Sequence, residues 1–234
     1  LSDSTLPRPD YIIADVGATV LHGDLRPVSP LHHDIAAGWP GTQVILQRLA
    51  KFPLLRRQTV PQERRCSFIV NEDGISDALR AEVEALDCDL LYSAGRYLDV
   101  LPRGINKGNS LRQLALAEGF DLDSIVVAGD TLNDLSMFAT GFKGIVVGSA
   151  EPELVDRVRK FPRVFVAQDE GCGGILAGLE HHGTQINHTP TAQRRMDERG
   201  DADLVMVYHR PPFDEVVEDG VRKQNRPKSP NGII

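Results

Sequence analysis

The second half of the chain alternates apolar runs with amphipathic segments. Continuous apolar runs predict buried strands at 124–128, 144–147 and 163–167. The segments around these runs have helical spacing and predict helices at 107–118, 132–139, 152–160 and 173–181. Strands that alternate with helices favour right-handed βαβ crossovers on a parallel sheet. This half of the chain therefore predicts an α/β fold.

The first half has a different pattern, with shorter elements that follow one another closely. The run 11–15 predicts a buried strand, and the Gly- and Pro-rich segment 23–30 predicts a loop. Beyond the loop, the pattern predicts a helix at 41–53, a strand at 65–70, a helix at 75–86 and a hairpin of strands at 88–92 and 97–101. Residues 17–103 therefore form a mixed α/β unit of their own in this interpretation.

Composition narrows the class of protein. The 234 residues carry 26 Lys and Arg against 33 Asp and Glu, a net charge of −7, and the length corresponds to about 1.5 domains. The acidic balance gives no electrostatic footprint for nucleic acid, and no apolar run approaches the ~20 residues of a membrane span. The three cysteines, Cys66, Cys88 and Cys172, are far apart, which favours a reducing cytoplasmic location.

A short motif, Gly-Asp-Thr-Leu-Asn-Asp at 129–134, follows the predicted strand 124–128 directly. Ligand sites of open α/β sheets lie at the carboxyl ends of strands, where this loop falls. Asp130 offers a hard oxygen ligand suited to Mg²⁺, while Asn133 and Asp134 fall on the first turn of the next helix. The alternative interpretation is ordinary turn and capping chemistry. The charges of 151–160, by contrast, are typical of a solvated helix face.

Lys107 begins a predicted helix, where a positive charge opposes the helix dipole. Such a residue is useful if it neutralises a bound phosphate, although a lysine taken alone is more simply a surface residue. Together with the Asp130 loop, the phosphate-binding interpretation is favoured.

The run Tyr-Ser-Ala-Gly-Arg-Tyr-Leu-Asp-Val-Leu-Pro-Arg-Gly-Ile-Asn-Lys-Gly at 92–108, followed by Val-Ala-Gly-Asp-Thr-Leu-Asn-Asp at 127–134, resembles the haloacid-dehalogenase (HAD) phosphatases. The closest branch is the sugar-phosphate phosphatases that resemble sucrose-phosphatase and carry a mixed α/β cap. The resemblance implies catalytic roles for Lys107, Asn133 and Asp134, with Lys107 on the transferring phosphoryl group. It also implies that Asp130 and Asp134 hold Mg²⁺.

The same resemblance divides the chain. It implies a partial HAD core with a Rossmann-like parallel sheet at 1–16 and 104–182, interrupted by an α/β cap at 17–103. Asp99, on the strand before Lys107, has two interpretations, one facing the cleft and one structural.

HAD phosphatases also need an aspartate nucleophile in the pattern Asp-x-Asp-x-Thr. The nearest match, Asp15-Val-Gly-Ala-Thr19, has Gly17 in place of the second Asp. We reject it, because 9–20 resembles the segment that enters the cap in sucrose-phosphatase relatives. The nucleophile is expected upstream of Leu1, and this chain by itself is expected to be inactive.

The last part of the chain resembles a second enzyme. Residues 183–202 are polar and predict a linker, and 204–208 predict a strand that opens another α/β domain at 203–234. His-Arg-Pro-Pro-Phe-Asp-Glu-Val and the later Ser-Pro-Asn-Gly-Ile-Ile resemble the glucosylglycerol-phosphate synthases, which are retaining glycosyltransferases of the trehalose-phosphate-synthase type. The resemblance implies that Arg210 binds the acceptor phosphate and that Gly232 approaches a sugar-nucleotide donor. The alternative is a tail with one β-strand.

The resulting expectation is a fragment of a bifunctional enzyme for compatible-solute synthesis. Its phosphatase would be Mg²⁺-dependent and act on glucosylglycerol phosphate, a small phosphorylated sugar. Two alternatives remain open. One is a sucrose- or trehalose-phosphate phosphatase, and the other is an inactive HAD module that regulates the fused glycosyltransferase.

Overall fold

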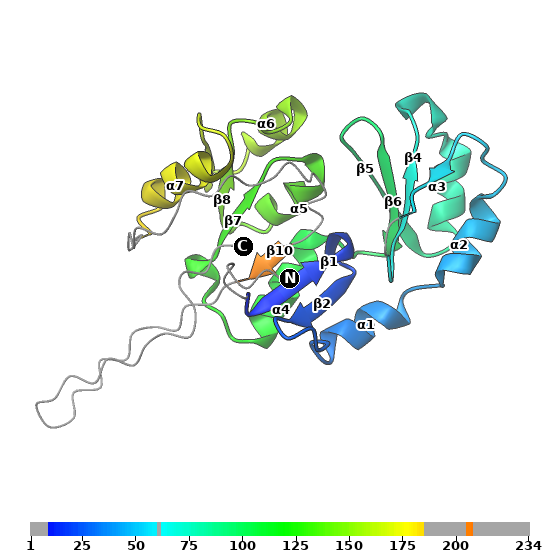
Figure 1. The fold of residues 1–234 in the computed structure, drawn as a ribbon, viewed down its shortest axis with the longest axis horizontal. Coiled ribbons are helices and arrows are strands. Elements are labelled where there is room, and N and C mark those ends of the chain that lie inside the picture. Colours follow the sequence, from blue (N-terminus) through cyan, green and yellow to red (C-terminus); the bar gives the residue numbers. More distant parts are fainter. Residues whose placement is uncertain (1–8, 60–61, 185–204, 208–234) are drawn as a thin grey trace, which may run out of the picture.

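The computed structural model describes residues 9–59, 62–184 and 205–207, which form two units that lie side by side (Figure 1). One unit contains a parallel sheet and the helices around it, and the other is the predicted cap. The elements of the first unit are β1 (Tyr11–Ala14), η1 (Asp15–Gly17), β2 (Thr19–His22), α1 (Leu31–Ala37), α4 (Lys107–Ala117), η3 (Leu122–Ser124), β7 (Val126–Gly129), η4 (Leu132–Asp134), α5 (Leu135–Phe138), β8 (Lys143–Val146), α6 (Pro152–Val158), β9 (Val164–Val166), α7 (Gly171–His181) and β10 (Val205–Val207).

The parallel sheet has the strand order β7-β8-β9, as the alternating pattern predicts. Successive side chains of a strand point to opposite faces, and both faces of this sheet are covered. Val126 and Ile145 pack against Leu179 of α7. Val127 and Val146 point to the other face and join the cluster formed with α4 and α5. This double coverage explains why the strands read as continuous apolar runs, and it confirms the α/β fold class.

A second, antiparallel sheet has the order β10-β1-β2. Strand β10 falls within the strand predicted at 204–208, but it pairs with β1 of the first unit, with Tyr11 opposite Val207, whereas the sequence prediction makes it the opening strand of another domain. Two elements of this region, β2 and α1, are absent from the sequence prediction. Their apolar residues are too few for a clear period, and they become ordered by packing Val20, Leu31 and Ile35 into the main core.

The cap consists of β3 (Arg56–Arg57), β4 (Cys66–Ile69), β5 (Cys88–Ser93) and β6 (Tyr97–Pro102), with α2 (Thr42–Leu49), η2 (Glu72–Gly74) and α3 (Asp77–Glu84). Its sheet is antiparallel with the order β3-β4-β6-β5. Ile45 of α2 and Leu79 of α3 are fully buried against Phe68, Leu98 and Val100 on one face of this sheet. The elements predicted between 41 and 101 are thereby confirmed.

The two units have separate hydrophobic cores. The core of the first unit extends from Ile13 to Ile35 and resumes at Leu101. The cap core begins with Trp39 and Ile45. The sequence predicts a cap that begins at 17, but the packing places 18–35 with the first unit. The reason is that β2 and α1 bury their apolar side chains in the same cluster as β1.

Within the described residues, none of the helices has the length and apolar character needed to cross a bilayer.

Candidate active site

The loop between β7 and η4 brings two backbone N–H groups onto one carboxylate. Asp134 Oδ2 accepts hydrogen bonds from Asp130 N at 3.0 Å and from Thr131 N at 3.2 Å. Thr131 and Asp134 form a capping box, so the predicted capping chemistry is present. Gly129 is required here, because a Cβ at this position would lie 2.6 Å from Asp134 Oδ2. The loop therefore holds Asp134 in one orientation.

Lys107 is buried in this site and not at the surface. Its side chain is 1% exposed, and Nζ donates to Asp134 Oδ1 at 2.8 Å and to Asn133 Oδ1 at 2.9 Å. A buried ammonium group needs such partners, because its desolvation is costly. The surface interpretation of Lys107 is therefore wrong, and the structure brings together the three residues Lys107, Asn133 and Asp134.

The start of α4 positions Lys107. Asn106 caps the helix by accepting a hydrogen bond from Asn109 N at 2.8 Å. Gly108 donates its N–H to Ser136 Oγ at 3.1 Å, and a Cβ on Gly108 would lie only 2.0 Å from Ser136 O. This glycine lets α4 approach α5 closely enough for Lys107 to reach Asp134.

Asp130 lies at the mouth of the site and is exposed as a residue. Desolvation of its carboxyl group and the negative charge of Asp134 raise its pKa, and Lys107 opposes the shift. The site therefore holds more negative charge than Lys107 neutralises.

Glu151 is a further acidic residue of the site that the sequence analysis assigned to a solvated helix. Its Oε2 accepts from Leu132 N at 3.2 Å, and its N–H donates to Asp130 O at 2.8 Å. Burial raises its pKa, with added contributions from Asp130 and Asp134. Its Oε1 is buried and has no hydrogen-bond partner among the described residues. Helical periodicity carries no signal for this contact, which arises because β8 ends beside β7.

These residues fit a hard divalent cation in part. In the described ranges, no three His, Cys, Asp or Glu side chains already converge as a metal-binding group. However, Mg²⁺ commonly takes only one or two carboxylates together with waters and substrate phosphates. The carboxylate of Asp130 and the unpartnered Oε1 of Glu151 supply oxygen donors of that kind. Both oxygens of Asp134 already accept hydrogen bonds.

The turn after β1 lies against the start of α4. Asp15, Val16 and Gly17 all have positive φ, at 51°, 54° and 109°. A Cβ on Gly17 would lie 2.4 Å from the carbonyl carbon of Asn106, and Gly17 O accepts a hydrogen bond from Ser110 Oγ at 2.7 Å. The glycine that replaces the second Asp of the nucleophile pattern thus has a packing role.

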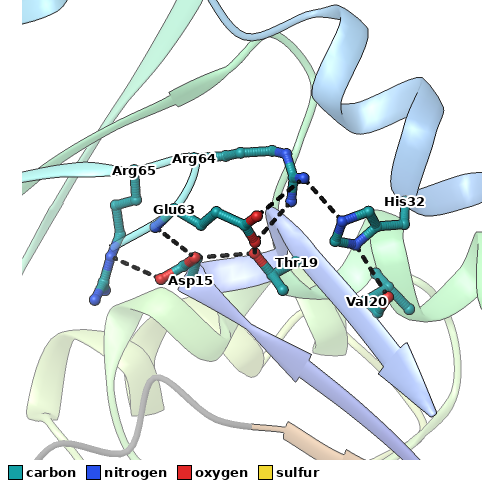
Figure 2. A network of polar contacts seen from close by, with 7 residues as sticks. All are labelled: Asp15, Thr19, Val20, His32, Glu63, Arg64 and Arg65. Carbon is teal, nitrogen blue, oxygen red and sulfur yellow. Dashed lines mark hydrogen bonds and ion pairs between the residues drawn. The ribbon is translucent and has the colours of Figure 1, made fainter. Parts of the chain in front are cut away.

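Figure 2 shows that the Asp15 carboxylate is engaged by the cap segment 63–65. Its Oδ2 accepts from Thr19 Oγ1 at 2.9 Å and from Glu63 N at 3.2 Å. The neighbouring Asp99 is 4% exposed and accepts a short hydrogen bond from Ser67 Oγ. The structural interpretation of Asp99 is therefore supported. Arg210 and Gly232 lie outside the described residues.

Comparisons with known proteins identify the family of the chain. The family described as sucrose-6F-phosphate phosphohydrolase matches residues 1–183. The chain is 31% identical over 194 residues to mannosylfructose-phosphate phosphatase from Agrobacterium fabrum, covering 78% of this chain and 77% of that protein. A solved sucrose-phosphatase from Synechocystis, in complex with sucrose and phosphate, aligns with a TM-score of 0.66 and 25% identity over 76% of each chain.

A longer relative matches the whole chain. The chain is 48% identical over 238 residues to glucosylglycerol-phosphate synthase from Pseudomonas anguilliseptica, covering 100% of this chain and 31% of that protein. The chain thus spans about a third of this relative's length.

The fold and these matches define the class as a sugar-phosphate phosphatase unit of the HAD type. Within that class, the chain belongs to the sucrose-6F-phosphate phosphohydrolase family.

Proposed function

We propose that this chain is the cap and part of the core of a Mg²⁺-dependent phosphatase that hydrolyses glucosylglycerol phosphate. The observation that carries the phosphatase chemistry is the buried ammonium group of Lys107, held at 2.8 Å by Asp134 and at 2.9 Å by Asn133. A fixed positive charge at a helix start stabilises the negative charge of a phosphoryl group without reorganisation. Asn133 and Asp134 act by holding that charge in place.

Asp130 would hold the metal, and Asp134 would fix the loop that carries Asp130. Glu151, which follows β8, would support the same loop through Leu132 and Asp130. This assignment keeps Asp130 and Asp134 as the metal-site residues and adds Glu151. When bound, Mg²⁺ would supply charge stabilisation to the phosphoryl oxygens. The formal charges support the assignment, because the carboxylates of Asp130, Asp134 and Glu151 face a single ammonium group, that of Lys107, and uncompensated negative charge favours a bound cation.

We propose that the aspartate nucleophile comes from a strand that precedes Leu1. In the family mechanism implied by the resemblance, this aspartate attacks phosphorus, the sugar alcohol leaves, and water hydrolyses the aspartyl phosphate. The open edge of β7 supports the proposal: among the described residues β7 pairs only with β8, so its other edge offers backbone groups to another parallel strand.

The substrate and the fused synthase are supported by the longer relative. That protein is named a glucosylglycerol-phosphate synthase, and it contains a counterpart of this entire chain. We therefore propose a bifunctional polypeptide in which Arg210 and Gly232 serve acceptor-phosphate and sugar-nucleotide binding. A phosphatase fused to the enzyme that makes its substrate would act on that product directly. We also propose a cytoplasmic location, which the buried thiols of Cys66 and Cys88 support.

The test uses the longer polypeptide that contains this chain. Phosphate release with Mg²⁺ should be measured for glucosylglycerol phosphate, sucrose phosphate and trehalose phosphate. We expect preference for the first. Equal turnover of all three contradicts the substrate proposal, and no turnover of any, with synthase activity retained, supports the inactive regulatory module.

A substitution tests the metal assignment. Asp130→Ala should reduce Mg²⁺-dependent phosphate release by at least about 100-fold, because it removes a metal ligand. Asp123→Ala is the matched control, because Asp123 is exposed and pairs with Arg163 at 2.8 Å away from the site. Activity retained in Asp130→Ala would show that another residue holds the metal.

A further inference from the structure

The cap and the core unit have separate buried hydrophobic clusters, and one partly buried residue of the cap, Leu91 on β5, also packs against the core cluster. The chain passes from the core cluster to the cap cluster between Ile35 and Trp39, and it returns between Val100 and Leu101. Gly41 and Gly104 lie just beyond these crossings and have positive φ, at 101° and 72°, and a Cβ at either would contact nothing within 4 Å. Units joined in this way change their relative position unless specific contacts hold them.

Asp15 makes such contacts from the core side. Its turn ends β1, and its side chain is only 12% exposed. Its Oδ2 accepts a hydrogen bond from Glu63 N at 3.2 Å, and its Oδ1 lies 3.8 Å from Arg65 Nε (Figure 2). Both Glu63 and Arg65 belong to the cap. Thr19 holds the carboxylate from behind, because its Oγ1 donates to Oδ2 at 2.9 Å.

Arg65 connects this carboxylate to the cap sheet. Its side chain is 8% exposed, and Nη1 lies 3.9 Å from Asp99 Oδ1, on β6. Asp99 stands opposite Ser67 in the sheet register, and Ser67 Oγ hydrogen-bonds its carboxylate. The guanidinium group therefore lies between one carboxylate of the core and one of the cap.

The neighbouring Arg64 makes a second connection. Its Nη2 lies 2.8 Å from His32 Nε2 on α1, while His32 Nδ1 lies 3.2 Å from Val20 O. The cap segment 63–65 is thus attached to the core at two points, and the contacts at both are polar.

The Asp15 turn also reaches the active site. Gly17 packs on the peptide between Asn106 and Lys107, and its carbonyl is bonded to Ser110 of α4. A displacement of the cap that moves Asp15 therefore also moves the turn 15–17, which contacts the peptide between Asn106 and Lys107. The cap is thus connected to Lys107 through the contacts of Asp15 with Glu63 and of Gly17 with the Asn106–Lys107 peptide.

We propose that Asp15, Arg65 and Asp99 form a core–cap latch, in which Asp15 is a positioning residue that holds the cap closed over the Lys107 site. The charge of Asp15 is needed, because an uncharged group of the same shape keeps the hydrogen bond from Thr19 and loses the attraction to Arg65. The latch is a property of this chain and does not depend on which sugar phosphate is the substrate.

The experiment measures the distance between the two units in the full 234-residue chain. Fluorescent labels are placed on Cys172, which is exposed on α7, and on an introduced cysteine, Ala81→Cys, at an exposed position of α3. Cys66 and Cys88 are buried and remain unlabelled in the folded protein. Single-molecule energy transfer then reports the fraction of molecules in which the cap is open.

Asp15→Asn and Arg65→Gln should each raise the open fraction by about threefold or more, whereas Arg65→Lys, which keeps the charge, should stay closer to wild type. The double variant should open no further than either single one, because both remove the same interaction. Asp24→Asn is the matched control, since Asp24 pairs with Arg26 in an exposed turn of the core unit.

Circular dichroism and the melting temperature of each variant identify any variant that fails to fold. If Arg65→Gln fails to fold, the comparison of Asp15→Asn with Arg65→Lys still tests whether the charge of Asp15 keeps the cap closed. An unchanged distance distribution in folded Asp15→Asn overturns the latch. Equal opening in Arg65→Lys and Arg65→Gln also overturns it, because the effect would then come from packing and not from charge. Neither result bears on phosphate release, so the proposed function is tested separately.

Discussion

At the scale of single residues, the site depends on one buried ion pair. Lys107 and Asp134 have side chains that are 1% and 7% exposed, and their charged atoms are 2.8 Å apart. Burial of either charge alone would cost a large desolvation free energy, and the attraction between the two charges offsets part of that cost. The motifs single out the same two residues, so a substitution that tests their proposed catalytic role should also change the stability of the fold.

We expect Lys107→Met to lower the free energy of unfolding by about 3–5 kcal/mol, because it leaves a buried carboxylate without its counter-charge. The double variant Lys107→Met, Asp134→Leu should recover part of that loss. Urea unfolding provides the measurement. Arg157→Met is the control, because the Arg157–Glu153 pair is exposed and should change stability by about 0–1 kcal/mol. A Lys107→Met effect no larger than the control would mean that the pair contributes little.

At the scale of elements, the position of α4 against α5 decides whether Lys107 reaches the loop. Gly108 makes this contact with the backbone of Ser136, and it follows Lys107 directly. Each residue of the motif Asn-Lys-Gly thus has its own role. Asn106 caps the N-terminus of α4, Lys107 carries the positive charge, and Gly108 allows the close approach of α4 to α5.

Gly108→Ala should reduce the free energy of unfolding by about 1–3 kcal/mol, because the added methyl group meets a main-chain oxygen at 2.0 Å and the helices must separate. Thermal or urea unfolding measures the change. Gly38→Ala is the matched control, since its φ is −82° and its nearest neighbours would lie at ordinary contact distances of 3.7 and 3.9 Å. Equal stability of the two variants would refute the packing argument.

The elements with strong periodicity are those that the sequence predicts correctly. The strands around Val127, Ile145 and Leu98 are apolar on the faces that the fold buries, so their patterns are visible without the fold. Strand β2 and helix α1 have weak patterns of their own and are fixed by tertiary packing. Glu151 shows the same limit for the site, because its contacts with Asp130 and Leu132 join two strand ends that are distant in sequence.

At the scale of the whole molecule, two units with separate cores meet at the polar contacts of 63–65 and at Leu91, which packs against the core cluster. Two histidines, His32 and His182, lie with one ring nitrogen close to a main-chain carbonyl oxygen. Burial lowers the pKa of His32 at the contact between the units and of His182 against Gly144 in the parallel sheet. Arg64 lowers the pKa of His32 further. The folded state therefore favours the neutral form of both rings.

The free energy of unfolding should consequently depend on pH. A histidine whose pKa is lower in the folded state binds fewer protons there, so its contribution is complete above the ordinary pKa of 6.5 and is lost as pH falls below it. Urea unfolding between pH 7.5 and 5.5 should show this decrease, and His32→Gln together with His182→Gln should make it smaller. The raised pKa values of Asp130 and Glu151 act in the opposite direction, since folded-state protonation adds stability as pH falls. An unchanged slope in the double variant would contradict the histidine assignment.

The sequence alone determined the α/β class and the order of most elements, because periodicity is a local property of the chain. Its short motifs also predicted the candidate set Lys107, Asp130, Asn133 and Asp134, of which the structure joins Lys107, Asn133 and Asp134 by hydrogen bonds. Only the tertiary structure decided that Lys107 is buried, that Glu151 joins the site, that 18–35 pack with the core unit and that Asp15 contacts the cap. Each of these depends on residues brought together from distant positions, and neither burial nor the pairing of charges has a local signal.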